Sequence, residues 1–222
     1  MIEKQKEARM KMPMEDQEEI DQRQMAAARS FCASPDPALQ FVFAMFALMS
    51  WLSILVKLQP DAMMVMGFLQ LSFGIAAFTG SRMNLKRMDP HGNINLILSV
   101  VLGFAGGLTQ IARAFVMAGH MEASFHSWIY SVILLAGGLY MLCFLPLMNK
   151  APAYIWFEHL FVCCGFVLMG LSDILQIPAF KMAAAWLLFT FALLALYQGI
   201  SEMYVCYGRT IPQGPSMPFG KD

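Results

Sequence analysis

The sequence predicts an all-α integral membrane protein that crosses a bilayer six times, on three observations. Of its 222 residues, 58% are hydrophobic and only 14% are charged, against roughly 25% charged in a soluble domain. The mean hydropathy is +0.56. The apolar residues are gathered into six long stretches that follow one another. A soluble helical bundle, the alternative, would need six core helices of this length in succession, which is disfavoured.

The six stretches cover residues 39–56, 61–80, 94–112, 127–148, 153–175 and 182–205. Crossing the hydrocarbon core takes roughly 20 residues of helix. Because lipid cannot hydrogen-bond a bare backbone, each stretch is expected to satisfy its own amides as a helix. The chain then divides into a charged tail (1–33), a membrane domain (34–207) and a short tail (208–222).

The first tail differs in composition from the rest of the chain. It is rich in Glu, Lys, Arg, Gln and Met, and the pairs Glu7/Lys11 and Glu19/Arg23 stand at helical i,i+4 spacing. Its mixed charge argues against a helix on the membrane surface. We expect a partly helical or disordered extension outside the membrane.

The distribution of lysine and arginine predicts that both termini are cytoplasmic. In that orientation twelve of the fifteen basic residues lie inside, as the positive-inside rule requires. They are Lys4, Lys6, Arg9, Lys11, Arg23, Arg29, Arg82, Lys86, Arg87, Lys150, Arg209 and Lys221. Only Lys57, Arg113 and Lys181 remain for the outer side. A multi-pass protein of the cell membrane is the expected localisation.

Charge and reactive residues exclude several function classes. The formal net charge of zero gives no indication of a nucleic-acid partner. The five cysteines lack CxxC or zinc spacing. His91, His120 and His126 are assigned to connections and only His159 to a helix, without an HExxH pattern. No Ser-His-Asp set or phosphate loop is present. We therefore expect no metal, no cofactor and no enzyme activity.

Polar residues at membrane depth can have either of two roles. They hydrogen-bond neighbouring helices, or they line a path for a small, weakly polar solute. The residues in question are Gln70, Ser72, Thr79, Asn95, Ser99, Thr109, Gln110, Tyr197 and Gln198. The charged Glu158, Asp173 and Glu202 are assigned to helix ends. A path would therefore be lined by hydroxyls and amides.

Small residues at four-residue spacing predict close helix packing. Gly103 and Gly107 form a GxxxG in the third stretch, and Ala76 and Gly80 repeat the spacing in the second. Such residues let helices approach closely in lipid. The pattern is common to transporters and structural membrane proteins, so it does not separate them.

Two terminal motifs carry a family resemblance. Ser34-Pro35-Asp36-Pro37-Ala38-Leu39 opens the first helix, and Tyr207-Gly208-Arg209-Thr210-Ile211-Pro212 follows Glu202 at the end of the last. Together with the basic 86–92 segment, they resemble the acetate uptake transporter family, also called succinate–acetate permeases, over residues 34–215. The resemblance implies six helices, a homo-hexamer, and a path through each protomer for a small monocarboxylate such as acetate, taken as the acid or with a proton.

The resemblance also assigns a substrate path. Phe43 matches the family's pore-narrowing phenylalanine, and Ser99 stands where the family keeps a pore tyrosine. Gln70 and Ser72 would offer hydrogen bonds. The second-helix motif of the family is missing at its place, and a similar Gly106-Gly107-Leu108-Thr109-Gln110 is set aside because it lies in the third stretch.

Two rival functions remain open. Loss of the second- and third-helix motifs favours a non-transporting membrane protein that retains the fold for assembly or sensing. A channel for another small neutral solute is the third possibility, because pore width and a few polar groups can select such a solute equally well.

Overall fold

The computed structural model describes residues 23, 34–119, 128–148 and 151–215, and within them the main secondary structure is helical, joined by short turns and followed by an irregular segment after Gly208. This confirms the predicted all-α membrane fold. The main helices are α3 (Asp36–Leu55), α4 (Pro60–Lys86), α5 (His91–Leu98), α6 (Gly106–Ala118), α7 (Trp128–Leu142), α8 (Ala153–Leu175) and α9 (Pro178–Cys206). A π-helix, η1 (Ser99–Ala105), joins α5 to α6, so that His91–Ala118 forms one continuous span.

Among the described residues, five helical spans are long and apolar enough to cross a membrane. The fourth predicted stretch, 127–148, is shorter as a helix than expected. Its helix α7 ends at Leu142 and is followed by a 3-10 turn, η3 (Leu145–Met148). Pro146 explains the early end, because a proline ring clashes with the carbonyl four residues before it and cannot donate to the helix.

The connection predicted over 81–93 is much shorter than expected. Helix α4 continues to Lys86, and α5 already begins at His91, so Arg82, Lys86 and His91 are helical rather than in a loop. Met88 turns the chain with a left-handed φ of 57°. The Asp89 carboxylate then accepts the backbone N–H of His91 at 3.0 Å, which satisfies a free donor at the start of α5.

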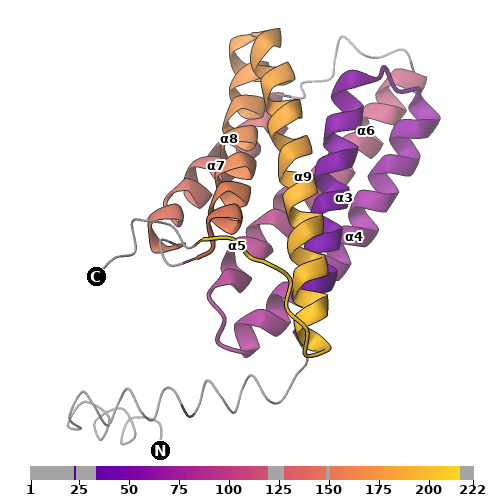
Figure 1. Ribbon diagram of the computed structural model, residues 1–222. Coiled ribbons are helices and arrows are strands. Elements are labelled where there is room, and N and C mark those ends of the chain that lie inside the picture. The colour runs from indigo at the N-terminus through magenta and orange to yellow at the C-terminus, as the bar shows by residue number, and fades with distance from the viewer. Residues whose placement is uncertain (1–22, 24–33, 120–127, 149–150, 216–222) are drawn as a thin grey trace, which may run out of the picture.

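Helix α9 is the axis of the bundle. It packs along both α3 and α8, while α7 packs on α8 and α4 packs on the third span. Figure 1 shows α9 standing between the indigo α3–α4 side and the orange α7–α8 side. The order of contacts makes two helical groups that meet along α9.

The glycine pairs lie where helices approach most closely. A Cβ on Gly107 would stand 2.8 Å from the carbonyl oxygen of Gly67 on α4, so only glycine fits there. Gly80, in contrast, faces the side chain of Leu39 on α3. The prediction that the GxxxG lies against a neighbouring helix is confirmed, and that helix belongs to the same chain.

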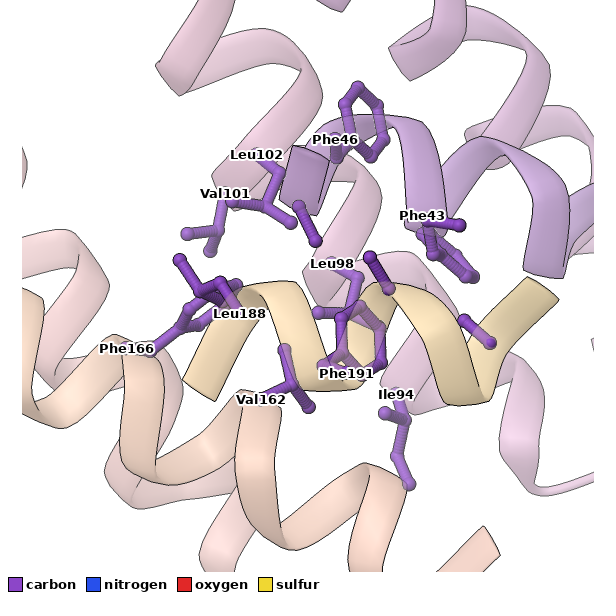
Figure 2. Close-up of a cluster of buried hydrophobic side chains, with 14 of the residues drawn as sticks. Phe43, Phe46, Ile94, Leu98, Val101, Leu102, Val162, Phe166, Leu188 and Phe191 are labelled. Carbon is purple, nitrogen blue, oxygen red and sulfur yellow. The ribbon is translucent and has the colours of Figure 1, made fainter. Parts of the chain in front are cut away.

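An apolar belt fills the middle of the bundle. Bulky side chains from α3, the third span, α8 and α9 converge there, as Figure 2 shows. We define the belt as Phe43, Leu98, Val101, Leu102, Val162, Phe166, Leu188 and Phe191. All of these side chains are buried, so the belt divides the interior of the bundle into two ends.

Candidate functional site

Two polar pockets lie on the two sides of the apolar belt. The first, here the Arg113 pocket, has a volume of about 60 Å³ and is lined by Ser50, Ser53, Ile54, Gln70, Gly106, Thr109, Gln110, Arg113, Tyr130, Leu134, Met169, Asp173 and Lys181. The second, the Glu202 pocket, has a volume of about 270 Å³ and is lined by Asp36, Gln40, Asp89, His91, Asn95, Ala151, Pro152, Ile155, His159, Gln198 and Glu202.

Four spans contribute residues to both pockets, whereas α4 and α7 contribute to the Arg113 pocket alone. On α3, Gln40 lines the Glu202 pocket, Phe43 belongs to the belt, and Ser50 lines the Arg113 pocket. Ten residues of helix rise about 15 Å, which sets the separation of the two pockets along α3.

The other three spans follow the same order from pocket to belt to pocket. The residues are Asn95, Leu102 and Thr109 in the third span, His159, Phe166 and Asp173 in α8, and Glu202, Phe191 and Lys181 in α9. All four helices have a pocket-lining residue near each end and a belt residue between them. They therefore define one axis through the bundle, which is polar at both ends and apolar in the middle.

The Arg113 pocket carries a net positive charge. Lys181 Nζ lies 3.5 Å from Asp173 Oδ1, and Ser131 Oγ donates to Asp173 Oδ2 at 2.7 Å. These two contacts hold Asp173 and balance the Lys181 charge. Arg113 forms no ion pair with any residue that the structure describes. Its planar guanidinium matches the geometry of a carboxylate.

Two glutamines add hydrogen-bonding capacity to the same pocket. Gln70 is only 3% exposed, and its Oε1 has no hydrogen-bond partner in the described structure. The Oε1 of Gln110 also lacks one. A buried acceptor without a donor costs about 1–3 kcal/mol. A water or a solute that donates a hydrogen bond, such as a protonated acid, would relieve that cost.

Tyr130 joins this pocket from α7, and sequence reasoning missed it. Its hydroxyl donates to the carbonyl oxygen of Val101 at 3.2 Å, and Val101 lies in the π-helix. The hydroxyl of a tyrosine inside an apolar stretch usually forms a hydrogen bond when it is buried. That signal was present in the sequence, but the partner on another span was not.

The Glu202 pocket is rich in carboxylates. His91 Nδ1 lies 2.9 Å from Asp89 Oδ1, and Gln198 Nε2 donates to Glu202 Oε1 at 2.7 Å. The third carboxylate, Asp36, accepts hydrogen bonds from the side chains of Ser34 and Asn84. The pocket thus differs in charge from the Arg113 pocket at the other end of the axis.

Two histidines meet in the Glu202 pocket. The rings of His91 and His159 lie 6.4 Å apart between centroids. His159 Nδ1 is 2.9 Å from the carbonyl oxygen of Ile155. No group of three or more His, Cys, Asp or Glu suited to a metal ion occurs in the described parts of the chain.

The structure places two of the four residues assigned to the substrate path in the belt or in a pocket. Phe43 lies in the belt and is 1% exposed, and Gln70 lines the Arg113 pocket. Ser99 is fully buried at the start of η1, where it donates to the carbonyl of Leu96, and it lines neither pocket. Ser72 lies on the exposed face of α4 and donates to Phe68 of its own helix.

The segment that sequence reasoning set aside does contribute to a pocket. Gly106, Thr109 and Gln110 all line the Arg113 pocket. Its location in the third span, the ground for excluding it, is what places it beside Gln70 of α4. Two spans that are adjacent in space can line the same pocket. The order of residues along the chain does not show which spans are adjacent.

The opening motif has a local structural role. Pro35 and Pro37 stand at the start of α3, where a missing amide donor costs nothing. The backbone N–H of Leu39 bonds to Pro35 at 3.0 Å, and its side chain packs on Gly80 of α4. The motif therefore fixes where α3 begins.

The closing motif also has a local role. Gly208 has a left-handed φ of 71°. Its N–H bonds to the Val205 carbonyl, and the Arg209 N–H bonds to the Tyr204 carbonyl, each at 3.0 Å. This pair is the Schellman arrangement that ends a helix with glycine.

Beyond Thr210, which is exposed, the chain folds back on the bundle. The Tyr197 hydroxyl donates to the Pro212 carbonyl at 2.5 Å, and the Ala153 N–H donates to the Pro215 carbonyl at 2.9 Å. The yellow segment in Figure 1 runs from the end of α9 back towards the start of α8. These contacts link α9 with α8.

Comparison with known proteins shows the fold. No family model matches the chain, and no curated protein matches it. A solved structure described as "Structure of the bacterial acetate channel SatP" is similar, with a TM-score of 0.66 and 18% sequence identity. The match covers 83% of this chain and 99% of that chain. The two chains share their fold.

Proposed function

We propose that this protein is a membrane channel or transporter for a small monocarboxylate such as acetate. One observation carries the proposal: four spans run from one polar pocket through an apolar belt to a second polar pocket. The fold shared with a bacterial acetate channel agrees with it. The proposal includes no cofactor and no nucleic-acid partner.

Arg113 favours a carboxylate as the solute. A guanidinium without an ion-pair partner in the described structure attracts anions and binds a carboxylate through two parallel hydrogen bonds. Gln70 and Thr109 line the same pocket and can bond the remaining lone pairs. A neutral solute would use the amides but gain nothing from Arg113.

The belt limits size and disfavours a bare charge. Phe43 is its bulky member on α3, and its ring narrows the route between the pockets. Burying an isolated carboxylate in an apolar environment is very costly. Passage as the neutral acid, or together with a proton, avoids that cost. The carboxylates and histidines of the Glu202 pocket are groups that can exchange such a proton.

We further propose the orientation and assembly. With both termini in the cytoplasm, the Arg113 pocket faces outward and the Glu202 pocket faces inward, in a multi-pass protein of the cell membrane. Exposed apolar residues such as Phe68 and Phe115 then contact lipid or neighbouring copies in a homo-oligomer, a hexamer by family resemblance.

A second candidate is a non-transporting assembly or sensing protein. The observation in its favour is that the belt is closed: Phe43 and Phe166 are almost fully buried, and the two pockets are separate. A sensor would bind the carboxylate in the Arg113 pocket without passing it on.

The test is entry of radiolabelled acetate, propionate and butyrate into proteoliposomes. We expect uptake above empty liposomes, and a loss of about tenfold for Arg113→Gln, because a hydrogen bond to a charged group contributes about 1.5–3 kcal/mol. Lys57→Gln is the matched control, since Lys57 is exposed and lines neither pocket. Binding of acetate without uptake would favour the sensor. If acetate neither binds nor enters, the monocarboxylate assignment is wrong.

A further inference from the structure

Tyr130 occupies the boundary between the Arg113 pocket and the apolar core. It lines the pocket and also packs against the buried core cluster. Leu134, one turn further along α7, does the same. These two side chains therefore form the floor of the pocket, where a solute would leave polar surroundings for the belt.

The π-helix determines where the Tyr130 hydroxyl is held. In η1 the carbonyl of Val101 accepts the N–H of Gly106, five residues later. The same oxygen accepts the Tyr130 hydroxyl at 3.2 Å. π-Helices are rare in proteins, and those that do occur often lie at functional sites. Here its wider turn gives one carbonyl two donors.

Gly106 leaves the space that the hydroxyl occupies. A Cβ atom at this position would stand 3.0 Å from Tyr130 Oη, closer than side chains normally approach. The residue belongs to the Gly106-Gly107-Leu108-Thr109-Gln110 segment, whose polar members line the same pocket. The glycine thus lets a phenol from α7 reach the backbone of the third span.

We propose that Tyr130 is the specificity-determining residue of the solute path, an inference that rests on the proposed function. Its ring sets the width of the pocket floor. Its hydroxyl turns from the Val101 carbonyl to the carboxyl group of the solute that Arg113 holds. The exchange is inexpensive, because Val101 keeps the Gly106 N–H and is not left without a donor.

The ring and the hydroxyl have separate effects, which two variants distinguish. Tyr130→Phe keeps the ring and removes the donor, so the KM for acetate should rise about tenfold with the acetate-to-butyrate preference unchanged. Tyr130→Ala removes the ring, so the ratio of the butyrate entry rate to the acetate entry rate should rise by about tenfold or more. A residue with only a packing role would change neither the KM nor this ratio selectively.

Two further variants serve as a positioning test and a control. Gly106→Ala should displace the hydroxyl and reproduce part of the Tyr130→Phe effect on KM. Tyr140→Phe is the matched control, because Tyr140 stands on the same helix but is 55% exposed and lines neither pocket. It should leave KM and selectivity unchanged. The melting temperature of each solubilised variant identifies any that fail to fold.

The experiment measures entry of acetate, propionate and butyrate, and of the three matching amides, into proteoliposomes. If acids enter and the Tyr130 variants match wild type, the inference is wrong while the proposed function holds. If amides enter and acids do not, the proposed function is wrong. In that case, entry of larger amides through Tyr130→Ala than through wild type would still support the inference that the Tyr130 ring sets the width of the path. If no solute enters, both are overturned.

Discussion

Gly103 of the third span lies against Gly74 of α4 so closely that a Cβ on Gly103 would stand 2.4 Å from the Gly74 Cα. One turn further on, Gly107 meets Gly67 in the same way. Two glycine pairs in succession bring the third span and α4 into backbone contact. This contact places Gln70 of α4 beside Gln110 in the Arg113 pocket.

Substitution at this contact should destabilise the bundle. Gly107→Leu places a side chain against the Gly67 backbone, and overpacking of this kind typically costs about 1–3 kcal/mol. We expect a lower melting temperature in detergent. Ala112→Leu on the exposed face of α6 is the control. An unchanged melting temperature for Gly107→Leu would contradict the packing described.

Truncation of the belt should widen the path. Phe43→Ala removes a buried ring and should raise the rate for butyrate relative to acetate. The cavity should also cost about 3–5 kcal/mol of stability. Phe46→Ala is matched in helix, size and burial, but its ring packs on Phe73 of α4. Equal selectivity changes in both variants would show that Phe43 is only a packing residue.

Filling the site of Ser99 should not narrow the path, in contrast to the expectation from family resemblance. Ser99 is fully buried and lines neither pocket, so Ser99→Tyr would overpack the start of η1. We expect reduced expression and a lower melting temperature. A well-folded Ser99→Tyr variant with restricted butyrate entry would restore Ser99 to the path.

Removing a carboxylate from the Arg113 pocket should strengthen anion binding. Asp173→Asn frees the charge of Lys181, which now pairs with Asp173 at 3.5 Å. The KM for acetate should fall a few-fold at low ionic strength and approach wild type at high salt, because partly exposed charges are screened. A rise in KM at low salt would indicate that Asp173 contacts the solute.

The orientation in the membrane can be tested by labelling. Lys86 ends α4 and is exposed. In a cysteine-free background, a cysteine at 86 should react with a membrane-impermeant thiol reagent only after cells are opened. A cysteine at 57, in the connection after α3, should react in intact cells. The reverse pattern would place the Arg113 pocket on the cytoplasmic side.

The apolar pattern of the sequence was sufficient to predict the helices. Six apolar stretches predicted where the helices lie, with ends that differ from the structure by up to six residues, because lipid leaves the backbone no alternative to a helix. The assignment of Phe43 and Gln70 to a substrate path stays a prediction, although the two residues lie in the belt and in the Arg113 pocket. The early end of α7 was missed although Pro146 marks it in the sequence. The helical extension through Arg82 was missed because the short turn into α5 depends on local contacts such as that of the Asp89 side chain.

Which polar residues face one another depends on how the helices pack. Ser72 and Gln70 are two residues apart on α4, yet one is exposed and the other lines a pocket, because successive positions on a helix face different directions. The pairing of Tyr130 with Val101 joins two spans through a π-helical carbonyl. Which turn of which helix stands beside another depends on packing, and in lipid close packing rather than hydrophobicity selects the neighbours.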